Sequence, residues 1–372
     1  MTAEHFGSVN TPVYRTSTVL YPDIHSLLTE NQPYKYGRRG TPTSRSFESA
    51  IEALEGDAAA RCVALPSGLS AITTAILSVC NAGDHMLMAD TCYGPTRIFC
   101  DKTLPRFGIE TTYYDATVGD GIAALIKDNT RAIYCESPGS LTFEIQDVPA
   151  IAKAAHARGV SVLMDNTWAT PVFFRPLDHG VDLSIMSGTK YIGGHADVMV
   201  GTITANESHT KRLEDFYGDC GLFLGGDDTY LSLRGVRTLA LRLKQHEASA
   251  LEIARWLQHR DEVVRVLHPG LQSDPGHSLW KRDFKGSSGL FGVELKPASE
   301  AAMTAFFDGF HHFGLGYSWG GYESLVIPSH FKRTAKRFEH DGPLIRFHAG
   351  LEDTNDLIAD IDAAFARLKA AP

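Results

Sequence analysis

The stretch Ser187-Gly188-Thr189-Lys190-Tyr191 decides the fold of this chain when it is read together with Met164-Asp165-Asn166-Thr167 upstream. A lysine flanked by small hydroxyl residues follows the apolar run 181–186, and an aspartate follows the apolar run 160–164. Apolar runs of this length are typical of buried strands. Lys190 follows Asp165 by 25 positions, which is room for one strand and its loops between neighbouring strands of an α/β sheet.

A lysine and an aspartate in this arrangement match the chemical needs of pyridoxal phosphate. The lysine forms a Schiff base with the aldehyde of the cofactor, and the aspartate keeps the pyridine nitrogen protonated so that the ring withdraws electrons. The alternative is a surface lysine and a strand-end aspartate that caps a loop. The two motifs favour the cofactor hypothesis, and the remaining motifs of the chain can support or weaken it.

Composition places the chain among globular proteins with a substantial core. Its 372 residues are 43% hydrophobic and 21% charged, which suits one large domain and a smaller one. The net charge of −9 argues against nucleic acid and anionic membranes as partners, because both attract basic surfaces. The first ten residues lack a signal-peptide pattern and no apolar run reaches membrane-spanning length, so we expect a cytoplasmic protein.

Several common site chemistries lack their motifs in this sequence. The pattern His195-Ala196-Asp197 is too short for a metal site, so we expect no metal ion. The dinucleotide fingerprint, the P-loop and the Gly-x-Ser-x-Gly elbow of serine hydrolases do not occur. The cysteines form no Cys-x-x-Cys pair, and we expect reduced thiols, several of them buried, at Cys62, Cys80, Cys92, Cys100, Cys135 and Cys220.

Short apolar strands alternate with helical patterns along most of the chain. A helix capped by Ser44 or Ser46 and ended by Gly56 comes first. The strands expected after it are 62–65, 85–89, 110–114, 132–136, 160–165, 182–186 and 198–204. The helices expected between them are 67–80, 94–107, 120–127, 147–158 and 207–217. This alternation predicts a doubly wound, mostly parallel sheet with helices on both faces.

A smaller α/β domain is expected at the C-terminal end. A long helical pattern over 227–259 leads into it, and strands are expected at 289–295 and 344–348, with a final helix over 355–368. The expected division of the chain is an extended N-terminal arm over 1–40, a large cofactor-binding domain over 41–235 and a small domain over 236–372.

Two motifs at strand ends are candidates for cofactor binding. Ser67-Gly68-Leu69 joins a strand to a helix, and free N–H groups at a helix N-terminus bind phosphate. The alternative for this motif is a well-capped helix without a ligand. Tyr93 follows the strand that ends near Asp90, where an aromatic side chain can stack on a flat ring. The alternative for Tyr93 is packing against its own loop.

Three further motifs are candidates for binding anions or a substrate. The arm carries Tyr36, Arg38 and Arg39 within a run that is dense in hydrogen-bond donors. A loop at 317–324 combines aromatic residues with two adjacent glycines, and Arg346 lies inside an apolar strand. Because arginine is seldom buried without a partner, a substrate carboxylate or a structural ion pair is expected beside it.

Together these motifs resemble the Cys/Met-metabolism family of pyridoxal-phosphate enzymes, which has the aspartate-aminotransferase-like fold (fold type I). The resemblance runs from Tyr36-Gly37-Arg38-Arg39-Gly40-Thr41-Pro42-Thr43 to Gly350-Leu351-Glu352-Asp353. Within the family it favours the branch that cleaves the Cβ–S bond of L-cystathionine. The passages that carry this choice are the arm motif, Glu136-Ser137-Pro138-Gly139-Ser140, Asp165-Asn166-Thr167-Trp168-Ala169 and Ser318-Trp319-Gly320-Gly321.

The resemblance implies a role for each candidate residue. Lys190 is expected to be the Schiff-base lysine and the base that removes the Cα proton, with Asp165 at the pyridine nitrogen. Tyr93, which stacks on the ring, and Tyr36 complete the expected catalytic set. The groups expected to hold the cofactor phosphate are Ser67, Gly68, Leu69, Ser187, Thr189 and, from a neighbouring subunit, Tyr36 and Arg38. The groups expected to bind substrate are Arg346 at the α-carboxylate, Ser318 and Trp319 beside it, and Arg39 at the distal end.

The implied reaction is a β-elimination that turns L-cystathionine into homocysteine, pyruvate and ammonia, a trans-sulfuration step toward methionine. Because arm residues reach a neighbouring cofactor, the resemblance implies a homo-oligomer, at least a dimer and in the fuller form a tetramer. The alternatives are a γ-lyase or γ-synthase, a cysteine desulfhydrase, and a non-catalytic pyridoxal-phosphate-binding protein. Trp319 favours the β branch, whereas Tyr93-Gly94-Pro95-Thr96 is closer to the γ branch.

Overall fold

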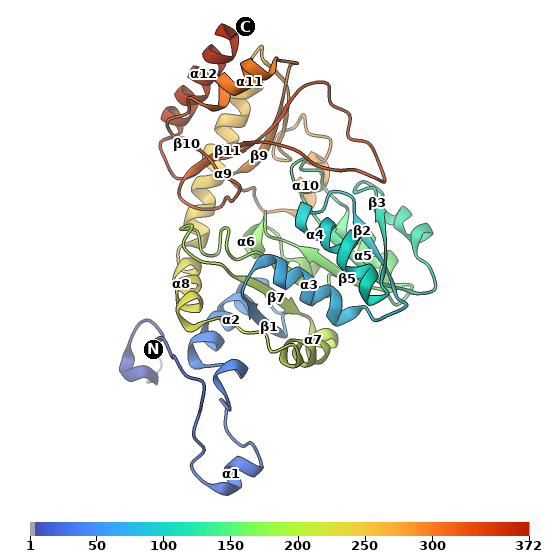
Figure 1. Ribbon diagram of the computed structural model, residues 1–372, viewed down its shortest axis with the longest axis vertical. Helices are drawn as coiled ribbons and strands as arrows, with labels where there is room; N and C mark the ends of the chain where they lie inside the picture. Colours follow the sequence, from blue (N-terminus) through green and yellow to red (C-terminus); the bar gives the residue numbers. More distant parts are fainter. Residues whose placement is uncertain (1–3, 372) are drawn as a thin grey trace.

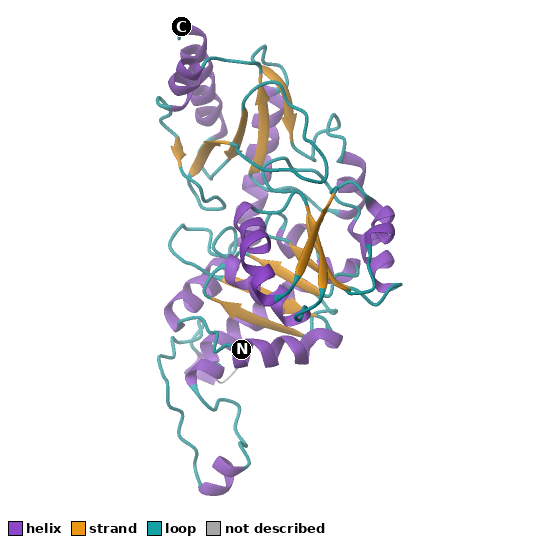
Figure 2. Cartoon of the chain, turned by 45° about the vertical axis from the view of Figure 1, so that its right-hand side comes forward, coloured by secondary structure: helices purple, strands orange, loops and turns teal. Residues whose placement is uncertain are grey.

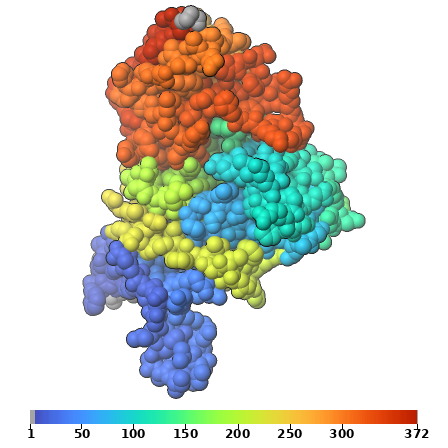
Figure 3. All heavy atoms as spheres, viewed as in Figure 1, coloured from blue at the N-terminus to red at the C-terminus, as the bar shows by residue number. Residues whose placement is uncertain are grey.

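This computed structural model describes residues 4–371. Within that range the chain forms a seven-stranded sheet, a five-stranded sheet and an N-terminal arm that projects away from both (Figure 1). The C-terminal elements lie at one end of the molecule and the arm lies at the other (Figure 3). The division into residues 1–40, 41–235 and 236–372 remains our proposal for the domain limits, with residues 1–3 and 372 outside the described range.

The larger sheet has the doubly wound, mostly parallel architecture that the sequence predicts. Its strand order is β1-β7-β6-β5-β4-β2-β3, and β7 alone among these seven described strands runs antiparallel to its neighbours. The parallel neighbours β5 and β6 therefore end at the same edge of the sheet. The strands are β1 (Arg61–Leu65), β2 (His85–Ala89), β3 (Glu110–Tyr114), β4 (Thr130–Glu136), β5 (Ser161–Asp165), β6 (Leu183–Met186) and β7 (Gly201–Ala205).

Helices cover both faces of this sheet, because successive side chains of a strand point to opposite sides. Along β2, Met86 and Met88 join the core on the side of α3 and α7, whereas Leu87 joins the core on the side of α2 and α5. The larger helices of this layer are α2 (Pro42–Glu55), α3 (Gly68–Val79), α5 (Val148–His156) and α7 (Glu207–Asp219). Shorter helices and turns are α1 (Ile24–Leu28), α4 (Gly94–Ile98), α6 (Thr170–Phe173), Glu4–Gly7, Gly37–Arg39, Phe99–Thr103, Leu104–Phe107, Gly119–Leu125 and Pro176–His179.

The smaller sheet has the order β10-β11-β12-β9-β8 and lies above the larger one (Figure 2). Its strands are β8 (Val263–Leu267), β9 (Leu290–Leu295), β10 (Phe313–Leu315), β11 (Ser324–Pro328) and β12 (Leu344–His348). The two strands predicted from the sequence, β9 and β12, are neighbours inside this sheet and are buried along their whole length. Its helices are α10 (His277–Asp283), α11 (Glu300–Phe307) and α12 (Thr354–Ala370).

Several predicted helices differ from those observed. The single helix expected over 227–259 is wrong, because the chain forms α8 (Gly226–Val236) and α9 (Leu239–Leu257) instead. Gly235 lies against the backbone of Ile192, where a Cβ atom would come 2.1 Å from the carbonyl oxygen. This tertiary contact leaves no trace in the apolar periodicity. The helix expected over 94–107 is an α-helix only as far as Ile98, and a π-helical turn and a 3-10 turn follow it. The helix expected over 120–127 is a 3-10 helix, Gly119–Leu125.

The cap of α2 was also predicted wrongly. The N-cap is Thr41, whose hydroxyl accepts from the Ser44 amide while the Ser44 hydroxyl faces the Thr41 amide. Pro42 occupies the first helical position, where its missing N–H costs nothing. The helix therefore begins three residues earlier than a cap at Ser44 would allow.

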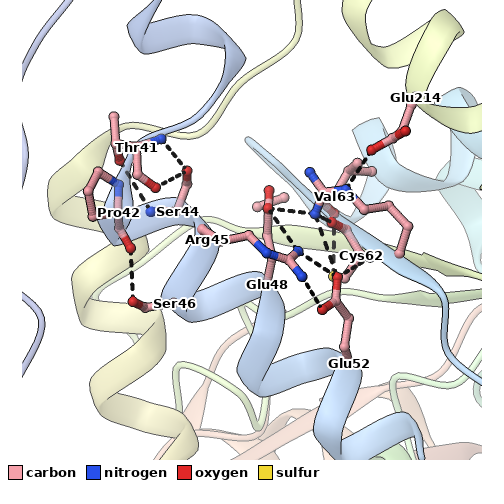
Figure 4. A network of polar contacts seen from close by, with 12 residues as sticks. Thr41, Pro42, Ser44, Arg45, Ser46, Glu48, Glu52, Cys62, Val63 and Glu214 are labelled. Carbon is pink, nitrogen blue, oxygen red and sulfur yellow. Dashed lines mark hydrogen bonds and ion pairs between the residues drawn. The ribbon is translucent and has the colours of Figure 1, made fainter. Parts of the chain in front are cut away.

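A cluster of buried charges fastens α2 to β1 (Figure 4). Nη1 of Arg61 lies 2.7 Å from Oε2 of Glu48, whose side chain is almost fully buried. Glu52 accepts a hydrogen bond from the Cys62 amide over 2.9 Å and pairs with Arg45 over 2.7 Å. Because a buried charge without its partner is costly, these contacts restrict where α2, and with it the base of the arm, can lie.

A loop of the small domain, which includes residues 333–336, is hydrogen-bonded to Asp90 of the large domain. We call this set of contacts the strap. The carboxylate of Asp90 accepts hydrogen bonds from the backbone amides of Thr334, Ala335 and Lys336 and from the Arg97 guanidinium. Arg333 adds a bond to the Asp90 carbonyl oxygen over 2.6 Å. Asp90 directly follows the last residue of β2, so the strap lies next to the segment that carries Tyr93.

Two kinds of feature are absent from the part of the chain that the structure describes. Among the helices of residues 4–371, none combines the length and the apolar character that crossing a bilayer requires. In the same range, no three His, Cys, Asp or Glu side chains are grouped so that they could hold a metal ion, and His195 bonds the carbonyl oxygen of Gly193. All six cysteines are free thiols, and Cys220 is the one that is exposed among these described residues.

Candidate active site

The predicted cofactor residues meet at the carboxyl edge of the large sheet, below the small domain. Asp165 is the last residue of β5, and Ser187 directly follows β6. The amide of Ser187 donates to the Thr167 hydroxyl over 2.8 Å, and that hydroxyl also binds Asp165 over 2.5 Å. The loop that leads to Lys190 is therefore tied directly to the loop that follows Asp165.

Lys190 reaches from the large domain to the small one. Its Nζ donates to Oγ of Ser318 over 2.9 Å and lies 5.3 Å from the ring centroid of Trp319. Burial and the nearby charge of Arg346 lower the pKa of Lys190 to about 8, although Asp165 opposes this shift. An amine with this pKa is partly unprotonated near neutral pH, which nucleophilic attack and proton abstraction both require.

Asp165 is a buried carboxylate whose hydrogen-bond donors are neutral. The backbone and hydroxyl of Thr167 both donate to Oδ1, and the Tyr134 hydroxyl lies 3.5 Å from Oδ2. Burial raises the pKa of Asp165, while the bonds from Thr167 and the charge of Lys190 act in the other direction. A protonated pyridine nitrogen would supply the positive charge that a buried carboxylate lacks here.

The predicted phosphate-binding segment, Ser67-Gly68-Leu69, lies close against the loop that carries Lys190. Ser67 caps α3 by accepting the Ser70 amide, which leaves the amides of Gly68 and Leu69 available to a ligand. A Cβ atom on Gly68 would lie 2.4 Å from Cβ of Ser187, so only glycine fits between the two loops. Anions bind well at such a helix N-terminus.

Thr189 is placed differently from the other residues predicted to bind phosphate. Its hydroxyl donates to the Val200 carbonyl oxygen over 3.2 Å and accepts from the Val200 amide over 2.9 Å. These bonds join the lysine loop to the segment before β7. A direct bond from Thr189 to phosphate stays a prediction, as do those from Ser67 and Ser187.

Tyr93 is held by a carboxylate that sequence reasoning missed. The Tyr93 amide donates to Oε2 of Glu136 over 2.8 Å, and 45% of the Tyr93 side chain is exposed, which leaves its ring free to stack. Glu136 ends β4 directly opposite Asp165 in the register of the sheet. Burial, reinforced by the charge of Asp165, raises the pKa of Glu136 well above its usual range. The signal that could have found it is a carboxylate at the end of a predicted neighbouring strand.

Arg346 is buried on β12 and has no carboxylate partner within residues 4–371. Its Nη2 donates to the carbonyl oxygens of Gly316, Tyr317 and Ser318, at 3.3, 2.9 and 3.1 Å. Its Nε is buried without a hydrogen-bond partner in the described part of the chain. Burial lowers the pKa of Arg346 to about 10. A guanidinium in this state is suited to binding a carboxylate brought by a ligand.

The arm residues do not join this group. Tyr36, Arg38 and Arg39 line a cavity of about 360 Å³ at the base of the arm, together with Arg61. Arg38 donates to the Gly218 carbonyl oxygen over 3.0 Å. The arm projects from the end of the molecule opposite the small domain (Figure 1), and Lys190 is not among the residues that line this cavity.

The residues that do come together fit pyridoxal phosphate. Lys190 offers a buried amine of lowered pKa, Asp165 offers a buried carboxylate bound only by neutral donors, and Gly68 keeps an anion-binding helix end open. Tyr93 and Trp319 add aromatic surface to the group. Amine, carboxylate, anion site and flat aromatic surface are the four partners that the parts of this cofactor require.

Comparison with known proteins agrees with this geometry. The family model described as Cys/Met metabolism PLP-dependent enzyme matches residues 1–366. A provisional cystathionine β-lyase of Rhizobium johnstonii is 50% identical over 99% of this chain and 93% of its own length. Cystathionine β-lyase MetC of Escherichia coli is 42% identical over 97% of this chain and 94% of its own.

A solved structure extends the likeness from sequence to fold. The crystal structure of MetB from Corynebacterium glutamicum is 32% identical and superposes with a TM-score of 0.89, covering 98% of this chain and 94% of the other. The cofactor residues of the site, the architecture and the family match all point the same way. The chain belongs to the Cys/Met metabolism family of pyridoxal-phosphate-dependent enzymes.

Proposed function

We propose that this protein is a carbon–sulfur β-lyase that cleaves L-cystathionine to homocysteine, pyruvate and ammonia, as a step toward methionine. The observation that carries the proposal is the meeting of Lys190 with Ser318 and Trp319, on the loop whose carbonyl oxygens bind Arg346. This arrangement puts an amine, an aromatic wall and a carboxylate anchor in one place between the domains. The names of the relatives from Rhizobium and Escherichia support the same reaction.

The protein residues fix the substrate before any bond breaks. Arg346 binds the α-carboxylate, which places Cα and its proton beside Nζ of Lys190. When bound, pyridoxal phosphate supplies an aldehyde for the substrate amine and an electron-withdrawing ring. Asp165 would keep the pyridine nitrogen of the bound cofactor protonated, because its buried carboxylate favours a positive neighbour. The amides of Gly68 and Leu69 hold the phosphate at the N-terminus of α3.

Lys190 then moves the proton. Because its pKa is lowered to about 8, more of its amine is unprotonated near neutral pH than for an ordinary lysine, and this form accepts the Cα proton. Ser318 accepts a hydrogen bond from the amine and so restricts its orientation. The electron pair left on Cα forms the Cα–Cβ double bond, and the thiolate of homocysteine leaves from Cβ. Release and hydrolysis of the remaining three-carbon unit give pyruvate and ammonia.

The test is the identity of the products from L-cystathionine. We expect equal amounts of pyruvate and homocysteine from the purified protein with its cofactor. The γ alternative gives 2-oxobutyrate and cysteine, and it needs a second proton taken from Cβ. Release of cysteine with 2-oxobutyrate would contradict the proposal, and so would turnover of cysteine alone with cystathionine left intact.

We further propose that the working form is a cytoplasmic homo-oligomer, at least a dimer and in its full form a tetramer. The arm exposes large apolar side chains without intramolecular cover, which supports burial against a second copy; they are Phe6, Leu20, Ile24 and Leu28. In such a dimer Tyr36 and Arg38 would reach the phosphate in the partner and Arg39 the distal end of the substrate.

A mixing experiment tests this assembly. The variants Arg38→Ala and Lys190→Ala, each inactive alone, are dissociated and reassociated together. Hybrid dimers contain one site that is intact in both residues, so we expect part of the activity to return. Light scattering of the wild-type protein gives the subunit number. A monomer by light scattering, or no recovered activity in verified hybrids, would contradict the proposal.

A further inference from the structure

We infer that His348 positions the substrate loop beside Lys190 by accepting the backbone N–H of Gly320, a role that deepens the proposed function and rests on it. The loop comprises residues 316–321 and carries Ser318 and Trp319. His348 touches neither Lys190 nor the residues that bind the cofactor, so it acts through the loop as a positioning residue.

Two side chains of one strand hold this loop. His348 follows Arg346 by two positions on β12, so both side chains leave the same face of the sheet. Arg346 binds the carbonyl oxygens of Tyr317 and Ser318. Nε2 of His348 lies 3.0 Å from the Gly320 nitrogen. Arg346 therefore holds the first half of the loop by donating to backbone carbonyl oxygens. His348 holds the second half by accepting from a backbone amide.

The loop needs this support because it packs directly on the backbone of Lys190. Gly320 has a φ of +85°, and a Cβ atom there would lie 2.8 Å from the carbonyl carbon of Lys190. The contact admits only glycine. A small displacement of Gly320 would therefore move Ser318 and Trp319 relative to Nζ of Lys190. The Ser318 Oγ atom lies 2.9 Å from this nitrogen, and the centroid of the Trp319 ring lies 5.3 Å from it.

The bond requires a neutral imidazole with its proton on Nδ1, a buried nitrogen that has no hydrogen-bond partner within the described residues. The Gly320 amide can only donate, so Nε2 must accept, although Nε2 also lies 3.3 Å from the Gly321 carbonyl oxygen. His348 is fully buried, and its ring faces those of His246 and Tyr191 at 5.2 and 6.0 Å. Burial, then the neighbouring His246 and the charges of Arg346 and Lys190, keep the pKa of His348 well below its usual value, although the contact with the Gly321 carbonyl oxygen opposes this shift.

The decisive comparison is between His348→Gln and His348→Met. The two replacements are nearly equal in size, but only glutamine keeps an acceptor that can reach the Gly320 amide. The control is His268→Met. His268 is also fully buried and accepts a backbone amide, that of Gly270 over 3.0 Å, but it packs on Phe291 within the small domain.

The readout is the affinity of the protein with its cofactor for glycine, followed by the change in the visible spectrum of the cofactor. Glycine has the α-amine and α-carboxylate but no leaving group, so the result does not depend on which carbon–sulfur bond the enzyme cleaves. Failure of the proposed function would appear separately, as wild-type protein that binds glycine but yields no homocysteine. The KM and kcat for L-cystathionine are measured on the same samples.

We expect His348→Met to weaken glycine binding and raise the KM for cystathionine about tenfold, because the Gly320 amide loses its partner. Cofactor content should stay at the wild-type level. His348→Gln should recover most of the affinity, and His268→Met should leave it within about twofold of wild type. Equal affinities for the Gln and Met variants, an equal loss in His268→Met, or a Met variant that does not fold would each overturn the inference.

Discussion

Nζ of Lys190 and Oγ of Ser318 lie 2.9 Å apart, and this hydrogen bond joins the loop after β6 to the loop before β11. The two residues are 128 positions apart in the sequence. The reactive amine of the large domain is therefore oriented by a residue of the small domain. Under the proposed function, a substrate held by Arg346 would bind beside these two groups, so catalysis would depend on how the domains meet.

Replacing Arg346 tests the carboxylate anchor. We expect Arg346→Ala to raise the KM for L-cystathionine about a hundredfold or more, because a buried charge-assisted bond to the substrate is lost. The cofactor should remain bound, since its own contacts lie on the large domain. Arg346→Lys keeps the positive charge but loses the planar guanidinium that binds a carboxylate with two N–H groups. This variant should therefore recover only part of the lost affinity for substrate. Loss of the cofactor in Arg346→Ala would show that this arginine is structural.

The lowered pKa of Lys190 predicts a specific reactivity. In protein freed of its cofactor, Lys190 should react with an amine-directed reagent and be half-reactive at a pH of about 8. The amine is the reactive form, so reactivity rises with pH through this value. Lys153, which is exposed on α5, is the internal control. Peptide mapping gives both rates; equal pH dependence would contradict the burial of Lys190.

Because the strap is formed by hydrogen bonds to the Asp90 carboxylate, we expect the contact between the two domains to depend on this one side chain. Bonds from the Thr334 and Ala335 amides and from Arg97 outweigh burial and lower the pKa of Asp90 from 3.8. The stabilisation by its charge is therefore fully present above the ordinary value and is lost as the pH falls through the lowered one. Asp90→Asn should lower the melting temperature by about 4 °C or more, equally from about pH 5 to pH 8.

The control for the strap is Asp101→Asn, which removes a more exposed partner of Lys332 at 3.6 Å. Exposed pairs contribute little, so its melting temperature should change by only about 1–2 °C. If both variants melted alike, the strap would not hold the domains.

The two carboxylates around Arg61 should differ strongly in their contribution to stability (Figure 4). Glu48 and Glu214 both lie 2.7 Å from the guanidinium, but the Glu48 side chain is 7% exposed and that of Glu214 is 48% exposed. We expect Glu48→Gln to reduce the free energy of unfolding by about 3 kcal/mol and Glu214→Gln by less than about 1 kcal/mol. Urea denaturation at saturating cofactor measures both, and equal losses would contradict the burial argument.

Much of the fold was predictable because its signals are local. The strands β2, β4, β5 and β6 are short apolar runs with little exposure, and they were placed within a residue or two. The edge strands β8 and β10 were missed, because β8 is half exposed and β10 has only three residues. The break between α8 and α9 was missed because apolar positions, among them Val236 and Leu239, continue across it in the sequence.

The site was predictable to the extent that its residues lie in short motifs. Lys190, Asp165, Gly68 and Arg346 were identified from their neighbours in the chain, and the fold brings them together. Glu136 and His348 were not identified as site residues. Their roles depend on contacts with Tyr93 and Gly320 that are made only in the folded chain.

The most direct test of the account is the variant Lys190→Ala, purified with added pyridoxal phosphate and assayed with L-cystathionine. The account predicts that the visible absorbance of the covalently held cofactor is absent and that no pyruvate forms, whereas Lys153→Ala retains both. The fold should persist, as circular dichroism would show, because Lys190 makes one side-chain hydrogen bond within the described residues. Pyruvate formation at the wild-type rate by Lys190→Ala would contradict the central claim.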